Sequence, residues 1–255
     1  MRLLSLFNYI AVVFALLLCS SQVMAWHDAT HMAIAKAAGL GNYAYLAVGA
    51  DMAKEKAGEI ESGNHYNNTP KGDKITPDIV LAQFNDYNKA GDTNGHLYGA
   101  IIASINNYII KGSGSKYALY SLGFASHYIG DLSMPFHNIE YNNFNKENHS
   151  TNDGIVENAG PKDETIDSKV LRITEEIRKR MSKIPTIRLS ANINKFYKEI
   201  AIHISNIANQ ASKIGYAMQE EHKTRLTEEE AYLQLAQSAH LLKAIYIIIN
   251  EASVP

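Results

Sequence analysis

Apolar residues recur at helical spacing along most of this 255-residue chain. The clearest run is YALYSLGFASHYIGDL, residues 117–132, in which apolar and aromatic side chains fall three or four positions apart. No segment shows the sustained alternation of apolar and polar residues that a half-buried strand requires. The sequence therefore predicts an all-α fold, and we expect a single multi-helix domain.

Helix breaks and caps divide the chain into segments. Residues 61–74, which are rich in Gly, Asn and Pro, and residues 138–149, an asparagine-rich segment, are predicted loops. Thr227 and Glu230 have the capping-box spacing for the last helix. The predicted helices cover residues 26–38, 42–60, 77–90, 94–111, 116–134, 150–157, 163–183, 190–220 and 228–251.

The first 25 residues have the pattern of a secretory signal. Arg2 precedes an apolar run over residues 10–18, and the small residue Ala25 follows a short polar stretch. The run is too short to span a bilayer, which needs roughly 20 residues. We therefore expect cleavage after Ala25, a mature domain of residues 26–255, and a secreted or periplasmic protein.

Removal of this signal has two chemical consequences. The only cysteine, Cys19, lies inside the signal, so the mature chain has no disulfide and depends on its core and on any bound metal. The alternative is lipid attachment at Cys19, although Leu18 before it is bulkier than such signals usually allow. Trp26, the only tryptophan, becomes the first residue, and its free amine becomes a candidate metal ligand.

Charge and hydropathy limit the partners. The formal net charge is −2, so bulk charge cannot hold nucleic acid or anionic lipid. The apolar stretch AIYIIIN, residues 244–250, lies between Lys243 and Asn250, which favours core packing over membrane insertion. We expect a monomer with no transmembrane helix, and peripheral contact with a membrane at most.

Histidines and aspartates gather between Trp26 and Asp153, most of them beside a predicted helix end or in a polar loop. Imidazole and carboxylate groups are ligands for zinc. The residues are His31, Asp51, His65, His127, Asp131, His137, His149 and Asp153.

Spacing groups several of these residues. His127 and Asp131 are four residues apart, so on a helix they project from one face and can bind one ion. Pro135 turns the chain, which lets His137 point back toward the same region. A second pair at the same spacing, His149 and Asp153, could bind another ion with His137. The simpler alternative for either pair is a surface ion pair, and Asp153 has the further alternative of favouring a helix N-terminus.

The other histidines and some short motifs indicate no chemistry. The chain has no serine nucleophile elbow, and GSGS lacks the Lys-Ser/Thr of a phosphate-binding loop. The histidines that we expect to be surface or satisfied core residues are His27, His96, His203, His222 and His240.

The ligand pattern resembles the bacterial zinc-dependent phospholipases C, which share a superfamily with the fungal and plant single-strand-specific zinc nucleases. The shared motifs are an exported N-terminal Trp with a His soon after, an Asp and a His 14 residues apart, H-x3-D-x5-H, and H-x3-[D/E]. The resemblance covers Trp26 to Asp153, and the helical remainder matches by architecture only.

The resemblance implies three zinc ions enclosed by the helices, with Asp131 bridging the first and third. Signal removal would then be an activation step, because the third site needs the free amine of Trp26. The implied ligands are Asp51, His65, His127 and Asp131 for the first ion, His137, His149 and Asp153 for the second, and the amine and carbonyl of Trp26 with His31 and Asp131 for the third.

The implied activity is hydrolysis of a phosphate ester by metal-activated hydroxide. Asp51 and Asp131 are the implied catalytic residues, with Asp51 orienting or deprotonating the attacking water. Phospholipid cleavage of the phospholipase C type is the leading hypothesis. A single-strand-specific nuclease and a non-catalytic zinc-stabilised helical domain are the alternatives.

Details of the motifs divide between the two enzyme branches. Asp153 in place of Glu and the short WHDATH segment resemble the nucleases, whereas the short segment from His137 to His149 resembles the phospholipases. The residues that recognise choline in the phospholipases are not evident, since Met52 and Ser62 occupy their places. A nuclease would need aromatic rings that stack on bases. The candidates for this role are Tyr66, Tyr128, Phe136 and Tyr141.

Overall fold

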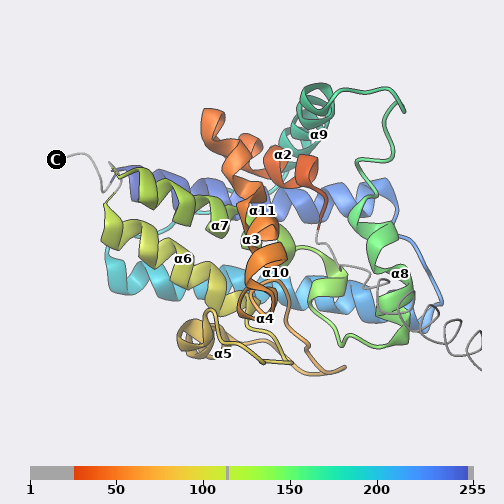
Figure 1. The fold of residues 1–255 in the computed structure, drawn as a ribbon, viewed down its shortest axis with the longest axis horizontal. Helices are drawn as coiled ribbons and strands as arrows, with labels where there is room; N and C mark the ends of the chain where they lie inside the picture. The colour runs from red at the N-terminus through yellow and green to blue at the C-terminus, as the bar shows by residue number, and fades with distance from the viewer. Residues whose placement is uncertain (1–25, 113–114, 252–255) are drawn as a thin grey trace, which may run out of the picture.

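The computed structural model describes residues 26–112 and 115–251, in which the chain forms ten α-helices, three 3-10 helices and no strand (Figure 1). The predicted all-α fold is confirmed, and the predicted signal with Cys19 lies outside the described residues. The elements are α2 (Asp28–Ala38), η1 (Gly41–Val48), α3 (Gly49–Ala57), α4 (Glu59–Ser62), α5 (Pro77–Ala82), η2 (Gln83–Asp86), α6 (Leu97–Lys111), α7 (Lys116–Leu132), η3 (Pro135–His137), α8 (Asn143–Asp153), α9 (Ile166–Met181), α10 (Ile193–Glu220) and α11 (Glu228–Glu251).

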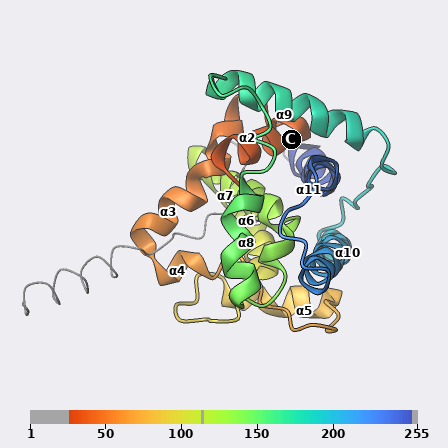
Figure 2. The ribbon, with the colours of Figure 1, turned by 90° about the vertical axis from the view of Figure 1, so that its right-hand side faces the viewer.

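Helix α7 lies at the centre of the fold. It packs against α6, η1, α11 and α2. The long helices α10 and α11 lie on one side of α6 and α7, and α3 with α4 lies on the other side (Figure 2). Every residue from Ala125 to Met134 is buried, so the chemistry carried by this end of α7 is screened from bulk water.

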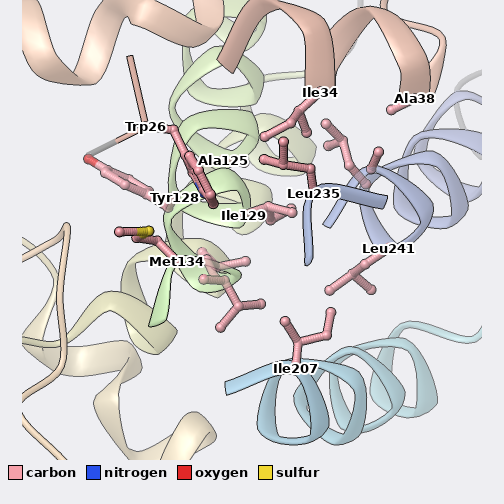
Figure 3. Close-up of a cluster of buried hydrophobic side chains, with 14 of the residues drawn as sticks. Trp26, Ile34, Ala38, Ala125, Tyr128, Ile129, Met134, Ile207, Leu235 and Leu241 are labelled. Atoms are coloured by element: carbon pink, nitrogen blue, oxygen red, sulfur yellow. The ribbon is translucent and has the colours of Figure 1, made fainter. Parts of the chain in front are cut away.

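The hydrophobic core joins α2, α7 and α11 around Trp26 (Figure 3). Ile34, Ile129 and Leu235, one from each helix, are fully buried, and burial of such a side chain stabilises the fold by about 1.5–3 kcal/mol. Trp26 is also fully buried, and its indole Nε1 donates a hydrogen bond to the carbonyl oxygen of Gly130 at 3.1 Å. The core therefore holds the start of the described chain against α7.

Two helix starts agree with their capping signals. The Thr227 hydroxyl accepts a hydrogen bond from the Glu230 backbone N–H at 3.2 Å, and the Thr227 N–H donates to the Glu230 carboxylate at 2.7 Å. The predicted capping box at α11 is therefore confirmed. Thr76 caps α5 in the same way, accepting from the Ile79 N–H at 3.3 Å.

The single helix predicted over residues 42–60 is wrong. These residues form η1, α3 and α4. Gly58 separates α3 from α4 with φ 54° and ψ −120°, a conformation that glycine adopts because it has no Cβ. Helix α5 likewise ends at Ala82 instead of continuing to Ala90.

Helix α6 begins later than predicted, and α8 begins earlier. Gly95 has φ 72°, so α6 starts at Leu97 and not at residue 94. The side chain of Asn142 caps α8, accepting from the Asn145 N–H at 3.1 Å. Residues 143–149 of the predicted loop are therefore helical, and His149 and Asp153 lie in the last turns of α8.

No helix within the described residues is long and apolar enough to cross a membrane. The apolar stretch 244–250 forms part of α11. Its Ile245 and Ile249 are buried in the core, as the sequence predicts.

Candidate metal centre

Four side chains from three parts of the chain converge in a first cluster, formed by Asp51 from α3, His65 from the segment after α4, and His127 and Asp131 from α7. His65 Nδ1 lies 3.1 Å from Asp131 Oδ2 and 3.2 Å from His127 Nε2. His127 Nε2 lies 3.4 Å from Asp131 Oδ2. Asp51 Oδ1 lies 3.7 Å from both His65 Nδ1 and His127 Nε2.

These separations fit the edges of a tetrahedron around zinc. Zinc binds nitrogen and carboxylate oxygen at about 2.0–2.1 Å, and a tetrahedron with such bonds has edges of about 3.3–3.4 Å. The measured separations in the first cluster, from 3.1 to 3.7 Å, scatter around that value. The donor atoms could therefore bind one ion with small adjustments.

Hydrogen bonds on the outer side of the cluster select the ligating nitrogen. His127 Nδ1 donates to the carbonyl oxygen of Ala47 at 2.7 Å, which leaves Nε2 facing the cluster. Both carboxylate oxygens of Asp51 are buried without a hydrogen-bond partner. Several electron-rich atoms thus share a space with little water, an arrangement that is costly without a cation.

A second cluster consists of His137 from η3 with His149 and Asp153 from α8, whose donor atoms lie within 4.8 Å of one another. His137 Nδ1 donates to the carbonyl oxygen of His65, and His149 Nδ1 donates to Asn145 Oδ1 at 2.7 Å. The Nε2 atoms of both rings and both oxygens of Asp153 are buried without a hydrogen-bond partner. A cation would satisfy all of them.

Asp131 links the first cluster to His31. Its Oδ2 atom faces His65 and its Oδ1 atom lies 3.3 Å from His31 Nε2. The His31 ring stacks on that of His127 with 3.8 Å between centroids, and its donor atom also groups with those of Asp51 and His127. His31 can approach α7 because Gly130 has no side chain, since a Cβ there would lie 2.6 Å from His31 Nδ1.

Trp26 lies beside the ends of α7 and α8. Its indole contacts Gly130, next to Asp131, and the N–H of His27 donates to the carbonyl oxygen of Asp153 at 3.5 Å. In the full-length chain the Trp26 nitrogen is an amide, so its role as a ligand through a free amine stays a prediction.

Burial shapes the charges of the two clusters. It lowers the pKa of His137 to about 4 and that of His149 well below its usual range, so both rings are neutral near pH 7. Burial also lowers the pKa of His127, but the carboxylates of Asp131 and Asp51 outweigh it and raise that pKa to about 9. The pKa of Asp153 is raised well above its usual range by burial and by Asp131. Ionised Asp153 therefore needs a cation.

These pKa shifts predict acid lability of the metal-free protein. Below pH 6.5 the unfolded chain protonates His137 and His149, whereas burial holds the pKa of folded His137 at about 4 and that of folded His149 well below its usual range. We therefore expect the free energy of unfolding to fall as the pH is lowered from 6.5 to 4, by up to about 1.4 kcal/mol per pH unit from His137, with a further decrease in the same direction from His149. Urea unfolding of chelated protein measures this slope, and His137→Gln should reduce it. An equal slope in that variant would contradict the prediction.

A pocket of about 370 Å³ reaches both clusters. His65 from the first cluster and His137 and His149 from the second line it. Lys54 also lines the pocket, and its charge lowers the pKa of His149. Lys54 is not among the residues predicted from the sequence, although it follows Asp51 by three residues and so shares a face of α3.

The aromatic residues that are candidates for stacking on bases differ in their exposure. Tyr66 and Tyr141 line the pocket, and Tyr141 is 39% exposed. Phe136 also lines the pocket but is almost fully buried. Tyr128 is fully buried and donates its hydroxyl hydrogen to Glu61, so it presents no ring for stacking.

Among the described residues, the three candidate metal groups contain all the predicted histidine and aspartate ligands and none of the five histidines that were set aside. No protein-family model and no curated protein matches the chain. The assignment of the centre therefore depends on its residues and their geometry.

Proposed function

We propose that this chain is an exported zinc-dependent phosphoric ester hydrolase similar to the bacterial phospholipases C. The observation that carries the proposal is the pair of buried, unsatisfied ligand clusters reached from one pocket, with Asp131 extending the first cluster to His31. The proposed ligands are Asp51, His65, His127 and Asp131 for the first zinc, His137, His149 and Asp153 for the second, and Trp26, His31 and the shared Asp131 for the third.

Zinc ions bound there would lower the pKa of water enough to supply hydroxide near neutral pH, and would stabilise negative charge on a phosphoryl group. Asp51 is suited to orient the attacking water, because its carboxylate oxygens are buried without a hydrogen-bond partner. Burial keeps the rings of His137 and His149 neutral, so the Nε2 lone pair of each ring is available to bind a metal ion.

Lys54 is proposed to stabilise charge on the substrate. It is a cation at the wall of the pocket, and its charge is close enough to the second cluster to contribute to the lowered pKa values of His137 and His149. A fixed positive charge at this place favours the more negative transition state over the bound substrate.

Replacing Lys54 with glutamine is expected to lower kcat by about 10- to 100-fold and to leave the zinc content unchanged. The matched control is Lys56→Gln, which removes an exposed cation from the same helix. Steady-state kinetics with metal analysis of both proteins measures the effect. Equal kcat values for the two variants would exclude this role of Lys54.

Phospholipids and single-stranded nucleic acids are the two candidate substrate classes of the proposed site. The short segment between His137 and His149 resembles that of the phospholipases, which favours phospholipids as substrates. Tyr66 and Tyr141, which line the pocket, favour the nuclease alternative because aromatic rings stack on unpaired bases. The test is a panel of short-chain phospholipids and single-stranded DNA and RNA, assayed with zinc and with chelator. Zinc-dependent release of phosphorylated head group supports the phospholipase, and cleavage of nucleic acid alone supports the nuclease.

The proposal includes export and cleavage after Ala25. Mass spectrometry of the secreted or periplasmic protein would identify its first residue, and a residue other than Trp26 would contradict the proposed third site. Fewer than two zinc ions per chain together with no activity on the panel would favour the non-catalytic zinc-stabilised domain.

A further inference from the structure

The side of His65 that faces away from the first cluster lies against a buried carboxylate. His65 Nδ1 points to Asp131, while His65 Nε2 lies 3.4 Å from Glu61 Oε1 and has no hydrogen-bond partner. Glu61 is only 4% exposed. A cation on Nδ1 leaves the ring proton on Nε2, where Glu61 is the acceptor at hand.

Other side chains hold the Glu61 carboxylate in place. The Tyr128 hydroxyl donates to Glu61 Oε1, and Asn64 Nδ2 donates to Glu61 Oε2 at 3.1 Å. Tyr128 and Asn64 are themselves fully buried. The position of the carboxylate is therefore determined by the core and not by solvent.

The orientation of Asn64 is determined in turn. Its Oδ1 atom accepts from the backbone N–H of Asn88 at 3.2 Å and from His96 Nε2 at 2.9 Å. His96 Nδ1 lies 2.9 Å from Asp92 Oδ2, at the partly exposed end of the network. With its oxygen held in this way, Asn64 can present only its NH₂ group to Glu61.

Close packing keeps His96 at this position. It is fully buried, its backbone N–H donates to the carbonyl oxygen of Gly63 at 2.8 Å, and a Cβ at Gly63 would lie 2.8 Å from His96 Cε1. Gly63 lies between Glu61 and Asn64 in the chain. This hydrogen bond and the close packing at Gly63 hold the segment that carries His65 against the residues before α6.

We propose that Glu61 is a positioning residue for His65, and that the buried network of Glu61, Asn64, His96 and Asp92 sets the metal affinity of the first cluster. A carboxylate behind a ligating histidine fixes the tautomer and raises the basicity of the ligating nitrogen. This inference rests on the proposed zinc site and deepens it. It assigns a function to Glu61, which belongs to neither ligand motif, and to His96, which lies outside the metal clusters.

The test is the variant Glu61→Gln, which keeps the shape and removes the charge. Zinc affinity is measured by competition with a chromophoric chelator, and the ligand field is measured by the absorption spectrum of the Co²⁺-substituted protein. We expect zinc to bind the first cluster about 10- to 100-fold more weakly and the Co²⁺ bands to shift. The matched control is Glu164→Gln, which removes a carboxylate that pairs with Arg172 at 2.9 Å and lies in none of the metal clusters.

A second variant keeps the inference testable if Glu61→Gln does not fold. Tyr128→Phe retains the Glu61 charge and the packed ring but removes one donor, and we expect about 2- to 10-fold weaker zinc binding. Unchanged zinc affinity in each folded variant would overturn the inference. Absence of zinc binding by the unmodified protein would instead overturn the proposed function, so the two failures are distinguishable.

Discussion

Replacing Asp131 with asparagine is expected to abolish most of the proposed hydrolase activity and to reduce the amount of zinc that the chain binds. Asp131 presents one oxygen to His65 and His127 and the other to His31, so it belongs to the first cluster and to the His31 site. An asparagine amide keeps the size but presents only one oxygen and no charge. Because loss of a residue behind a ligand already costs 10- to 100-fold, we expect loss of this shared ligand to cost on the order of 1,000-fold or more in kcat/KM.

The control for this experiment is His203→Ala, which removes a half-buried histidine of α10 that belongs to none of the metal groups. It should retain zinc and turnover. Circular dichroism of both variants separates loss of the site from loss of the fold. Full zinc content and turnover in Asp131→Asn would show that the assignment of the first cluster is wrong.

Removing the proposed zinc ions is expected to lower the melting temperature of the protein by about 10 °C or more. A ligand present at 1,000 times its dissociation constant stabilises the folded state by about 4 kcal/mol, and 1 kcal/mol corresponds to about 2–4 °C in a protein of this size. The physical reason is that chelation leaves Asp51, His137, His149 and Asp153 buried with unsatisfied donor atoms. Thermal unfolding with and without EDTA measures the shift.

Adding zinc back to the chelated protein should restore both the melting temperature and the activity, and magnesium should restore neither. Magnesium prefers octahedral oxygen ligands, whereas half of the first cluster is imidazole. An unchanged melting temperature after complete removal of metal would contradict the proposal that the clusters are held together by cations.

Local signals in the sequence predicted several helices and failed at others for identifiable reasons. Thr227 and Glu230 lie one turn apart and cap α11 without help from the rest of the fold. The break at Gly58 was not predictable in the same way, because glycine also occurs inside helices and its conformation depends on how α3 and α4 pack. Helix α8 begins within the asparagine-rich segment because Asn142 caps it. The composition of this segment is typical of a loop and did not indicate the cap.

Sequence spacing likewise predicted only some of the residues of the candidate metal centre. The pairs His127 with Asp131 and His149 with Asp153 were readable as neighbours from their spacing of four residues. The joining of Asp51 and His65 to the first pair came from the resemblance, and the residue spacing did not predict it. Lys54 and Glu61 were missed, since a lysine or a glutamate near a ligand is common on solvent-exposed helices.

The sequence by itself determined the helical class, the kinds of ligand and the two pairs at helical spacing, because these properties depend on a few neighbouring residues and on the helix repeat. Only the tertiary structure decided which nitrogen of each histidine faces the centre. That choice depends on the Ala47 carbonyl behind His127, the His65 carbonyl behind His137 and Asn145 behind His149. Two of these three partners are distant in sequence, and core packing brings them within hydrogen-bonding distance.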